Sequence, residues 1–415
     1  MRLTMLLLLG VQQAAQPASA AAGTPWKIDT LIVTYWAGPA LTDSVARQMA
    51  EGGWNLVWCG EKQLDVAQRH GLRAQLQHGL LRPGTLDNPA QREKLDALIA
   101  RVRNHPALYS YFITDEPSAA EFPALGKLVA YLRQRDPAHL AYINLFPTYA
   151  NNKQLGTKGD KITAYQDHLR QYMQIVKPSL VSYDHYQFAK GGDKPDYFLN
   201  LAMIRRTAQE ARVPFLNIVQ ACTWTPSMRV PGPDELRYLV YTTLAYGGQG
   251  ISYYVYCHPR HTGGIALSDG RPTPLYHALK SLNREFVAIA KELQPLRSLA
   301  VYHAGMLPPG SVRLSQEAPF RFDPPVTPLA YSPPERVCGF LLGCFGKDKQ
   351  PSHAVVVNLD YKAEAAVALT GPGKLEAFDA KSGRWSTAGG MRLEIKLPPG
   401  GGKLVRGVRE SRRRD

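Results

Sequence analysis

The stretch Tyr109-Ser110-Tyr111-Phe112-Ile113-Thr114-Asp115-Glu116-Pro117 predicts a buried strand that ends abruptly in two carboxylates and a proline. Apolar and aromatic residues fill the run and the charges come only at its end, which is typical of a barrel strand whose last residues face a ligand. Pro117 lacks a backbone N–H and disfavours helical geometry at Glu116, so we expect the strand to stop there. In isolation such a pair would more often begin a solvated loop, so its meaning depends on the rest of the chain.

Segments typical of strands and of helices alternate around this stretch with a spacing of roughly 30 residues, the pattern of βα units and a parallel sheet. The eight segments that we expect to be strands are Thr30–Trp36, Trp54–Cys59, Arg73–Gln77, Leu108–Thr114, Ala141–Phe146, Leu180–Tyr186, Phe215–Ala221 and Ile251–Cys257. Eight units predict a closed (β/α)8 barrel, the TIM barrel, over residues 24–298.

Two of the helices between these strands carry clear start signals. Asn88 is expected to cap a helix that begins with Pro89, and Asp234 is expected to cap the next-to-last helix. The apolar stripe of the first helix predicts its buried face; its members are Leu95, Leu98, Ile99 and Val102.

Beyond the barrel, proline pairs punctuate much shorter segments. The expected strands there are Ala354–Leu359, Ala365–Leu369, Lys374–Phe378 and Met391–Leu397. Short strands separated by turn residues predict an antiparallel β-sandwich domain over residues 299–409, followed by a basic tail over residues 410–415.

Composition and the N-terminus suggest an exported globular protein. Of the 415 residues, 45% are hydrophobic and 20% are charged, which argues against disorder. Residues 1–20 combine Arg2, an apolar run and a small-x-small cleavage site, so we expect a signal peptide and a secreted or periplasmic location. No second run is long enough to predict a membrane span. The net charge of +15 has no nucleic-acid-binding motif beside it, so we expect no nucleic-acid partner.

The five cysteines do not form a disulfide framework that the sequence can define. Cys59, Cys222 and Cys257 lie in apolar runs and are expected in the core. Cys338 and Cys344 flank a short apolar segment and could pair, a question that depends on geometry.

In a barrel of this kind the ligand site is built at the carboxyl ends of the strands. Aromatic and polar residues gather there on almost every expected strand, a combination that suits the apolar faces and hydroxyl rim of a sugar. The expected substrate-binding residues are Tyr35, Trp36, His78, Asp115, Asn144, Tyr183, His185, Tyr186, Gln220, Trp224, Tyr254, Tyr256 and His258. The histidines lie on separate strands without a paired ligand motif, so we expect neither a metal site nor another cofactor.

Cleavage of a glycosidic bond requires two carboxyl groups. Glu116 is the expected acid, because burial among aromatic residues would raise its pKa. Asp184 is the expected second carboxylate, since it ends an aromatic strand two units away; the alternative is that Asp184 orients His185 or caps the next segment. Asp115 is expected to point behind its strand, because successive side chains alternate, and to support the site.

The fourth strand, with an acid carboxylate at its end, resembles the barrel glycoside hydrolases of clan A. Residues Gly264 to Tyr276 with Leu282 to Phe286 are similar to the end of the barrel in the β-galactosidase-like family 42 group. Residues Phe378 to Gly383 and Leu397 to Gly400 look like its appended β-domain. The resemblance implies a carbohydrate substrate and Glu116 as the acid.

One motif of that family is missing. Clan A enzymes carry a nucleophilic Glu at the end of the seventh strand, where this chain has Gln220 within Val219-Gln220-Ala221-Cys222-Thr223-Trp224. The sequence therefore predicts a glycoside hydrolase that uses Asp184 as base or nucleophile. A catalytically inactive carbohydrate-binding barrel, a lyase and a metal-dependent hydrolase remain as alternatives.

Overall fold

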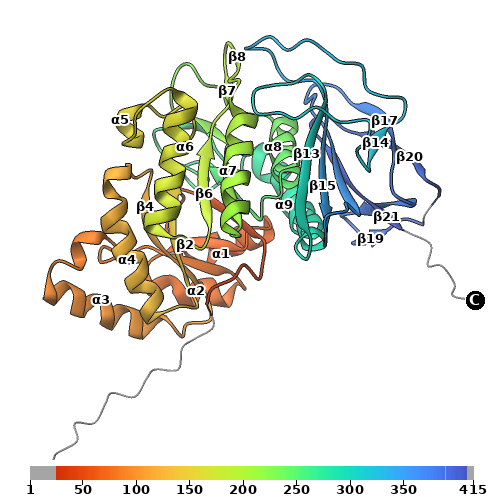
Figure 1. Cartoon of the computed structure of the whole chain (residues 1–415). Helices are drawn as coiled ribbons and strands as arrows, with labels where there is room; N and C mark the ends of the chain where they lie inside the picture. The colour runs from red at the N-terminus through yellow and green to blue at the C-terminus, as the bar shows by residue number, and fades with distance from the viewer. Residues whose placement is uncertain (1–24, 388, 409–415) are drawn as a thin grey trace, which may run out of the picture.

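The computed structural model describes residues 25–387 and 389–408, so the expected signal peptide and basic tail lie outside the described residues. A parallel eight-stranded barrel, red to green in Figure 1, is followed by antiparallel sheets in teal and blue that lie beside it. The predicted (β/α)8 TIM barrel with a C-terminal antiparallel β-sandwich is confirmed.

The barrel strands follow the spatial order β1-β11-β9-β6-β5-β4-β3-β2, and every neighbouring pair is parallel. Their bounds are β1 (Ile32–Trp36), β2 (Leu56–Cys59), β3 (Arg73–Leu76), β4 (Leu108–Asp115), β5 (Leu140–Leu145), β6 (Val181–His185), β9 (Phe215–Gln220) and β11 (Gly250–Tyr254). All eight predicted strands occur, with slightly different ends.

The barrel closes between β1 and β2 through a side chain. The Asn55 backbone N–H donates to the Val33 carbonyl oxygen at 3.1 Å, and its side-chain oxygen accepts from the Val33 N–H at 2.8 Å. Its amide nitrogen donates to the Leu31 carbonyl oxygen at 2.6 Å. Asn55 thus takes the place of part of a strand ladder and satisfies backbone groups that a buried gap would leave unpaired.

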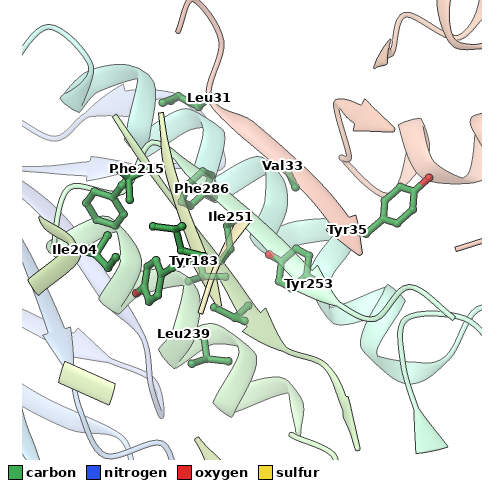
Figure 2. Close-up of a cluster of buried hydrophobic side chains, with 14 of the residues drawn as sticks. Leu31, Val33, Tyr35, Tyr183, Ile204, Phe215, Leu239, Ile251, Tyr253 and Phe286 are labelled. Atoms are coloured by element: carbon green, nitrogen blue, oxygen red, sulfur yellow. The ribbon is translucent and has the colours of Figure 1, made fainter. Parts of the chain in front are cut away.

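Successive residues on each strand serve two separate cores, because side chains of a strand point alternately to its two faces. The inward-facing core of the barrel includes Ile32, Leu56, Tyr109, Leu140, Tyr142, Leu216 and Ile218. The second core fills the layer between strands and helices, where Figure 2 shows Leu31, Val33, Ile251 and Phe286.

The helices that cover the barrel are α1 (Asp43–Glu51), α2 (Leu64–Arg69), α3 (Pro89–Val102), α4 (Phe122–Arg135), α5 (Asn152–Leu155), α6 (Lys161–Gln171), α7 (Tyr197–Ala211), α8 (Pro233–Ala245) and α9 (Pro274–Leu293). Short helical turns cover Glu61–Gln63, Pro83–Thr85, Ala119–Glu121 and Tyr172–Val176. The side chain of Asn88 caps α3, and the four expected apolar residues are its buried face. The expected cap of α8 is wrong: Gly232 is the N-cap, and Glu235 accepts its N–H at 2.7 Å.

The C-terminal domain consists of two facing sheets. The larger has the order β13-β15-β16-β21-β18-β19, and the smaller has the order β14-β17-β20. The bounds are β13 (Arg297–Gly305), β14 (Arg321–Phe322), β15 (Gly339–Gly346), β16 (His353–Asn358), β17 (Ala365–Thr370), β18 (Lys374–Asp379), β19 (Arg384–Trp385), β20 (Arg392–Leu397) and β21 (Gly402–Val408). A buried cluster that includes Phe320, Leu342, Val356, Leu369 and Ile395 joins the sheets.

The sandwich packs against the barrel mainly through α8, which contacts β15 and β16. This explains why nearly every residue of α8 is buried although a barrel helix usually has one exposed face. Gly343 permits the contact, since a Cβ there would lie 2.1 Å from the Ala245 carbonyl oxygen. The two domains therefore share one continuous interior rather than meeting across a loose linker.

All five cysteines are free thiols, so Cys338 and Cys344 do not pair. Cys59, Cys222 and Cys257 are buried, as expected. Across residues 25–387 and 389–408, no helix combines the length and the apolar character needed to cross a bilayer.

Candidate active site

The chain turns sharply where β4 ends. A β-bulge between Phe112 and Thr114 shifts the alternation by one residue, so Asp115 lies in register with Asn144 and faces into the barrel. The expectation that Asp115 points behind the strand is wrong for this reason. Glu116 then takes a φ of 45°, rare for a residue with a Cβ, and its N–H donates to the Asn144 carbonyl oxygen at 2.9 Å. Strained backbone of this kind concentrates at functional sites.

Asn144, on β5, links two carboxylates that belong to the neighbouring strands β4 and β6. Its amide nitrogen donates to Asp115 and to Asp184, each at 3.0 Å. The Ser182 hydroxyl donates to the Asn144 side-chain oxygen at 3.0 Å, and this fixes which way the amide faces. Because an amide carries two N–H donors and no charge, Asn144 can hold two carboxyl groups close together without neutralising either.

Glu116 and Asp184 are hydrogen-bonded to each other through their carboxyl groups. Burial, and then the nearby Asp115 charge, raise the pKa of Glu116 to about 7. Burial, and then the charges of Glu116 and Asp115, raise the pKa of Asp184 well above its usual value. Two carboxyl groups in contact cannot both ionise readily, so the pair retains a proton near neutral pH.

None of the three carboxylates has a salt bridge within the described part of the chain. Lys194 is a nearby cation, and its ammonium lies over the ring of Tyr149 at 4.2 Å from the ring centre. Burial lowers the pKa of Lys194, while the charge of Asp184 acts in the opposite direction. The Tyr149 hydroxyl accepts the N–H of Tyr186 at 3.3 Å, which places a phenol beside the same pair.

Two groups of aromatic rings lie at this end of the barrel, and most of their members belong to the inward-facing core. The first consists of Trp36, Trp58, Phe112 and Tyr142, with ring centres 4.7 to 6.4 Å apart. The second consists of Tyr186, Trp224, Tyr254 and His261, with ring centres 4.9 to 5.9 Å apart. Several of these rings are only partly buried, so flat apolar faces remain available beside the carboxyl pair.

Four of the expected substrate-binding residues face the helices instead. Tyr35 packs against Tyr256 with ring centres 5.1 Å apart, and Tyr183 lies beside Ile204, as Figure 2 shows. His185 is bound to Asn200 of α7 at 2.9 Å. Strand alternation explains these positions, because the neighbours of an inward-facing residue must point outward.

Gln220, where the related family has its nucleophile, is completely buried and fully engaged. Its side-chain oxygen accepts the N–H of Phe188 at 2.9 Å. Its amide nitrogen donates to the carbonyl oxygens of Phe188, Cys222 and Arg229 at 3.1, 3.3 and 2.7 Å. Gln220 therefore fastens two loops at the mouth, including the hairpin formed by β7 (Phe188–Ala189) and β8 (Gly192–Asp193).

The remaining expected residues lie at the rim. His258 is half-buried, and its ring lies 4.2 Å from that of His261. His78 lies on the loop after β3, where its ring nitrogen accepts the N–H of Leu80 at 3.2 Å. In residues 25–387 and 389–408, no three His, Cys, Asp or Glu side chains lie close enough together to hold a metal ion.

Trp58, Tyr142 and His261 are among the residues that the structure brings to this site and that the sequence reasoning missed. Trp58 and Tyr142 alternate in phase with Leu56 and Leu140, so the period of two on β2 and β5 could have identified them. His261 follows the short connection after β11 and binds the Tyr254 hydroxyl at 3.0 Å. No periodicity extends into a loop, so nothing local in the sequence could have placed His261.

A scan against protein-family models and a search of curated proteins both find no match for this chain. Solved structures do match. A catalytic mutant of Gan42B, a GH42 β-galactosidase from G. stearothermophilus, aligns over 92% of this chain and 98% of its own, with 10% identity and a TM-score of 0.56. Another structure of Gan42B aligns over the same shares, with 9% identity and a TM-score of 0.52.

A β-galactosidase from the psychrophilic Marinomonas ef1 aligns over 63% of this chain and 60% of its own, with 12% identity and a TM-score of 0.45. At these identities the similarity establishes the fold alone. The chain thus shares its fold with the two Gan42B structures over most of its length.

Proposed function

We propose that the protein is a glycoside hydrolase in which Glu116 and Asp184 form the catalytic pair. The observation that carries the proposal is the hydrogen-bonded contact of these carboxyl groups at the carboxyl end of the barrel, beside two groups of aromatic rings. A protonated carboxyl at the expected ligand-binding end of a barrel supplies the acid that a glycosidic oxygen requires.

Glu116 is the proposed proton donor. Its pKa of about 7 leaves it largely protonated in mildly acidic solution, and it is the less buried member of the pair. Turnover that depends on this proton should fall as the pH rises above about 7.

Asp184 is the proposed second carboxylate, and its contact with Glu116 constrains what it can do. Carboxyl groups lie about 5 Å apart in retaining enzymes and about 6.5 to 9.5 Å apart in inverting ones, further than a direct hydrogen bond allows. A bound sugar must therefore separate the pair before Asp184 can act as base or nucleophile; otherwise Asp184 serves by holding the proton on Glu116. Asn144 and Asp115 then support the pair.

The aromatic residues Trp36, Trp58, Tyr186, Trp224 and Tyr254 are the proposed sugar-binding surfaces. The rings of Trp36, Trp58, Trp224 and Tyr254 are partly exposed and can cover the C–H faces of a pyranose, while Tyr186 is buried and packs against Trp224 and Tyr254. The amide and hydroxyl groups beside them match a rim of hydroxyls, so a neutral oligo- or polysaccharide fits the site.

Release of sugar from aryl glycosides and polysaccharides tests the proposal, beginning with β-galactosides because the structural neighbours are named for them. Glu116→Gln should lower kcat by about 10² to 10⁴-fold, since it keeps the shape of the side chain but removes its proton. The matched control is Glu93→Gln on the exposed face of α3, which should keep full activity. Equal rates in the wild type and Glu116→Gln would refute the role of Glu116.

A carbohydrate-binding protein without catalysis is the second candidate, and the engaged amide of Gln220 favours it, because no carboxylate occupies that strand end. Isothermal titration with the same sugars separates the two. Sugar bound by both the wild type and Glu116→Gln, with no product from either, would select the binding protein. Export is part of the proposal for either candidate, and fractionation of expressing cells tests it.

A further inference from the structure

An open hollow of about 1090 Å³ lies at the other end of the barrel. It is formed where β6, β9 and β11 begin, beside the end of α7 and the start of β13. Its charged lining residues are all cationic: Lys27, Arg133, Lys177, Arg205, Arg212 and Arg297. Neither Asp nor Glu lines it, so the charges are concentrated around one space without a local counter-charge.

These six cations have no carboxylate partner within the described part of the chain. Some are explained by the helices that end here, because basic residues are favourable near helix C-termini. Arg133, in the last turn of α4, donates to the carbonyl oxygen of Lys177 at 2.6 Å. Arg297 belongs to a strand and Lys27 to the chain before β1, so helix ends do not account for them.

Arg205 is the most informative of the six. Its guanidinium is partly buried and is held in place by Ser298, with Nε to Oγ at 3.1 Å and Nη2 to the carbonyl oxygen at 3.2 Å. Burial lowers the pKa of Arg205, and no carboxylate opposes that effect. A partly desolvated cation without a counter-ion is costly, and an anion bound in the hollow would offset the cost.

The hollow also presents acceptors for hydroxyl groups. The amide nitrogen of Gln209 donates to the carbonyl oxygen of Ser298 at 2.6 Å, and that of Gln294 donates to the carbonyl oxygen of Ile28 at 3.1 Å. Both side chains line the hollow, and since one N–H of each amide is engaged, the amide oxygen and the second N–H can bind hydroxyl groups of a ligand. A ligand that satisfies cations and carbonyl oxygens together carries both anionic groups and hydroxyls.

We infer that this hollow binds an acidic saccharide, one with uronate carboxylates or sulfate esters, separately from the Glu116–Asp184 site. Ser179, at the hollow, lies just before β6, and Asp184 follows it by five residues within β6, so roughly 16 Å of extended chain separates the two sites. The inference does not require Glu116 to be catalytic, because the hollow would bind its ligand in either case.

Binding of the full mature chain to polygalacturonate, dextran sulfate, neutral dextran and single-stranded DNA, measured by titration calorimetry at low and high salt, tests the inference. The hollow variant carries Arg133→Gln, Arg212→Asn and Arg297→Gln; asparagine suits position 212 because its φ is 57°. The matched control carries Arg92→Gln, Lys94→Gln and Arg103→Gln, an equal loss of charge on exposed residues of and after α3 that do not line the hollow.

At least one acidic polysaccharide should bind the wild type and the control, and its Kd should rise by at least about tenfold in the hollow variant. Binding of polygalacturonate alone would identify carboxylates as the recognised group, and binding of dextran sulfate alone would identify sulfate esters. Thermal melting shows whether each variant is folded; if the triple variant does not fold, Arg297→Gln alone is measured against Arg103→Gln.

Three results would overturn the inference. An equal loss of affinity in the hollow and control variants would show general attraction to a basic protein. Binding of single-stranded DNA as tight as that of the polysaccharides, or of neutral dextran, would remove the preference for an acidic saccharide. Absence of binding to both acidic polysaccharides would remove the site.

Discussion

The two ends of the barrel carry opposite charge. At the carboxyl ends, Asp115, Glu116 and Asp184 lie together with no salt bridge among the described residues. At the amino ends, six cations surround a hollow that no carboxylate lines. Each end concentrates like charges, which repel one another and destabilise the folded chain. A residue of opposite charge at either end would remove this cost.

This difference in charge between the two ends indicates that the barrel can carry two separate sites, one at each end. In a parallel barrel the loops at one end are not the loops at the other, so chemistry at one end need not constrain its opposite. At the carboxyl ends the like charges are tolerated because a shared proton neutralises part of them. At the amino ends no carboxylate lines the hollow, so a bound anion is what would neutralise the cations.

The largest effect on activity is expected from a substitution that breaks the Glu116–Asp184 pair at the carboxyl end. Asp184→Asn should lower kcat by about 10² to 10³-fold on the best aryl glycoside, because the neutral amide neither shares a proton with Glu116 nor acts as a carboxylate. Asp348→Asn, on the exposed surface of the C-terminal domain, is the control and should keep the wild-type rate. An unchanged kcat for Asp184→Asn would leave Glu116 without its proposed partner.

Gln220 stands where clan A enzymes have their nucleophilic Glu, and Gln220→Ala tests whether the residue at this position stabilises the fold. The change leaves backbone groups of Phe188, Cys222 and Arg229 without their partner and should cost about 3 kcal/mol of unfolding free energy. Urea unfolding measures the loss. Gln77→Ala, an exposed glutamine at the same end of the barrel, should cost less than about 0.5 kcal/mol. Equal stability of the two variants would contradict the anchoring role.

The proton shared by Glu116 and Asp184 should make the free energy of unfolding depend on pH. Because the folded pKa of Glu116, about 7, lies above the usual 4.5, its contribution is fully present below pH 4.5 and is lost as the pH rises through 7. Glu116→Gln cannot ionise, so its stability relative to the wild type should increase by about 2 to 3 kcal/mol between pH 4 and pH 8. For the exposed control, Glu93→Gln, the same difference should stay flat; a flat profile for Glu116→Gln would exclude the raised pKa.

The smallest expected effect comes from a carboxylate at the same end that does have a counter-ion. Glu61 follows β2 and forms a salt bridge with Arg101 at 2.7 Å, which holds the pKa of Glu61 below its usual value. Glu61→Gln should change the unfolding free energy by less than about 1 kcal/mol and kcat by less than twofold. A loss comparable to that of Asp184→Asn would show that proximity to the mouth, rather than the lack of a counter-ion, marks the functional carboxylates.

Much of the carboxyl-end site was predictable, because period-two alternation and strand ends are local signals. Five of the expected residues face into the barrel, in agreement with the period-two alternation of their strands: Trp36, Asn144, Asp184, Tyr186 and Tyr254. The same alternation, applied more strictly, would have removed Tyr35 and Tyr183, which face the helices. The position of a strand end alone does not separate Tyr35 from Trp36 or Tyr183 from Asp184, because it carries no information on which of the last two side chains turns inward.

The sequence by itself determined the alternating strands and helices, the eight-unit barrel and the change to short strands in the C-terminal domain, because periodicity and turn residues are encoded locally. The tertiary structure alone decided that a bulge turns Asp115 inward and that the Gln220 side chain is hydrogen-bonded to the backbone of two loops. It also decided that six cations from distant segments surround one hollow. Each of these depends on which residues of separate segments become neighbours. That is settled by packing of the whole chain, which no window of sequence contains.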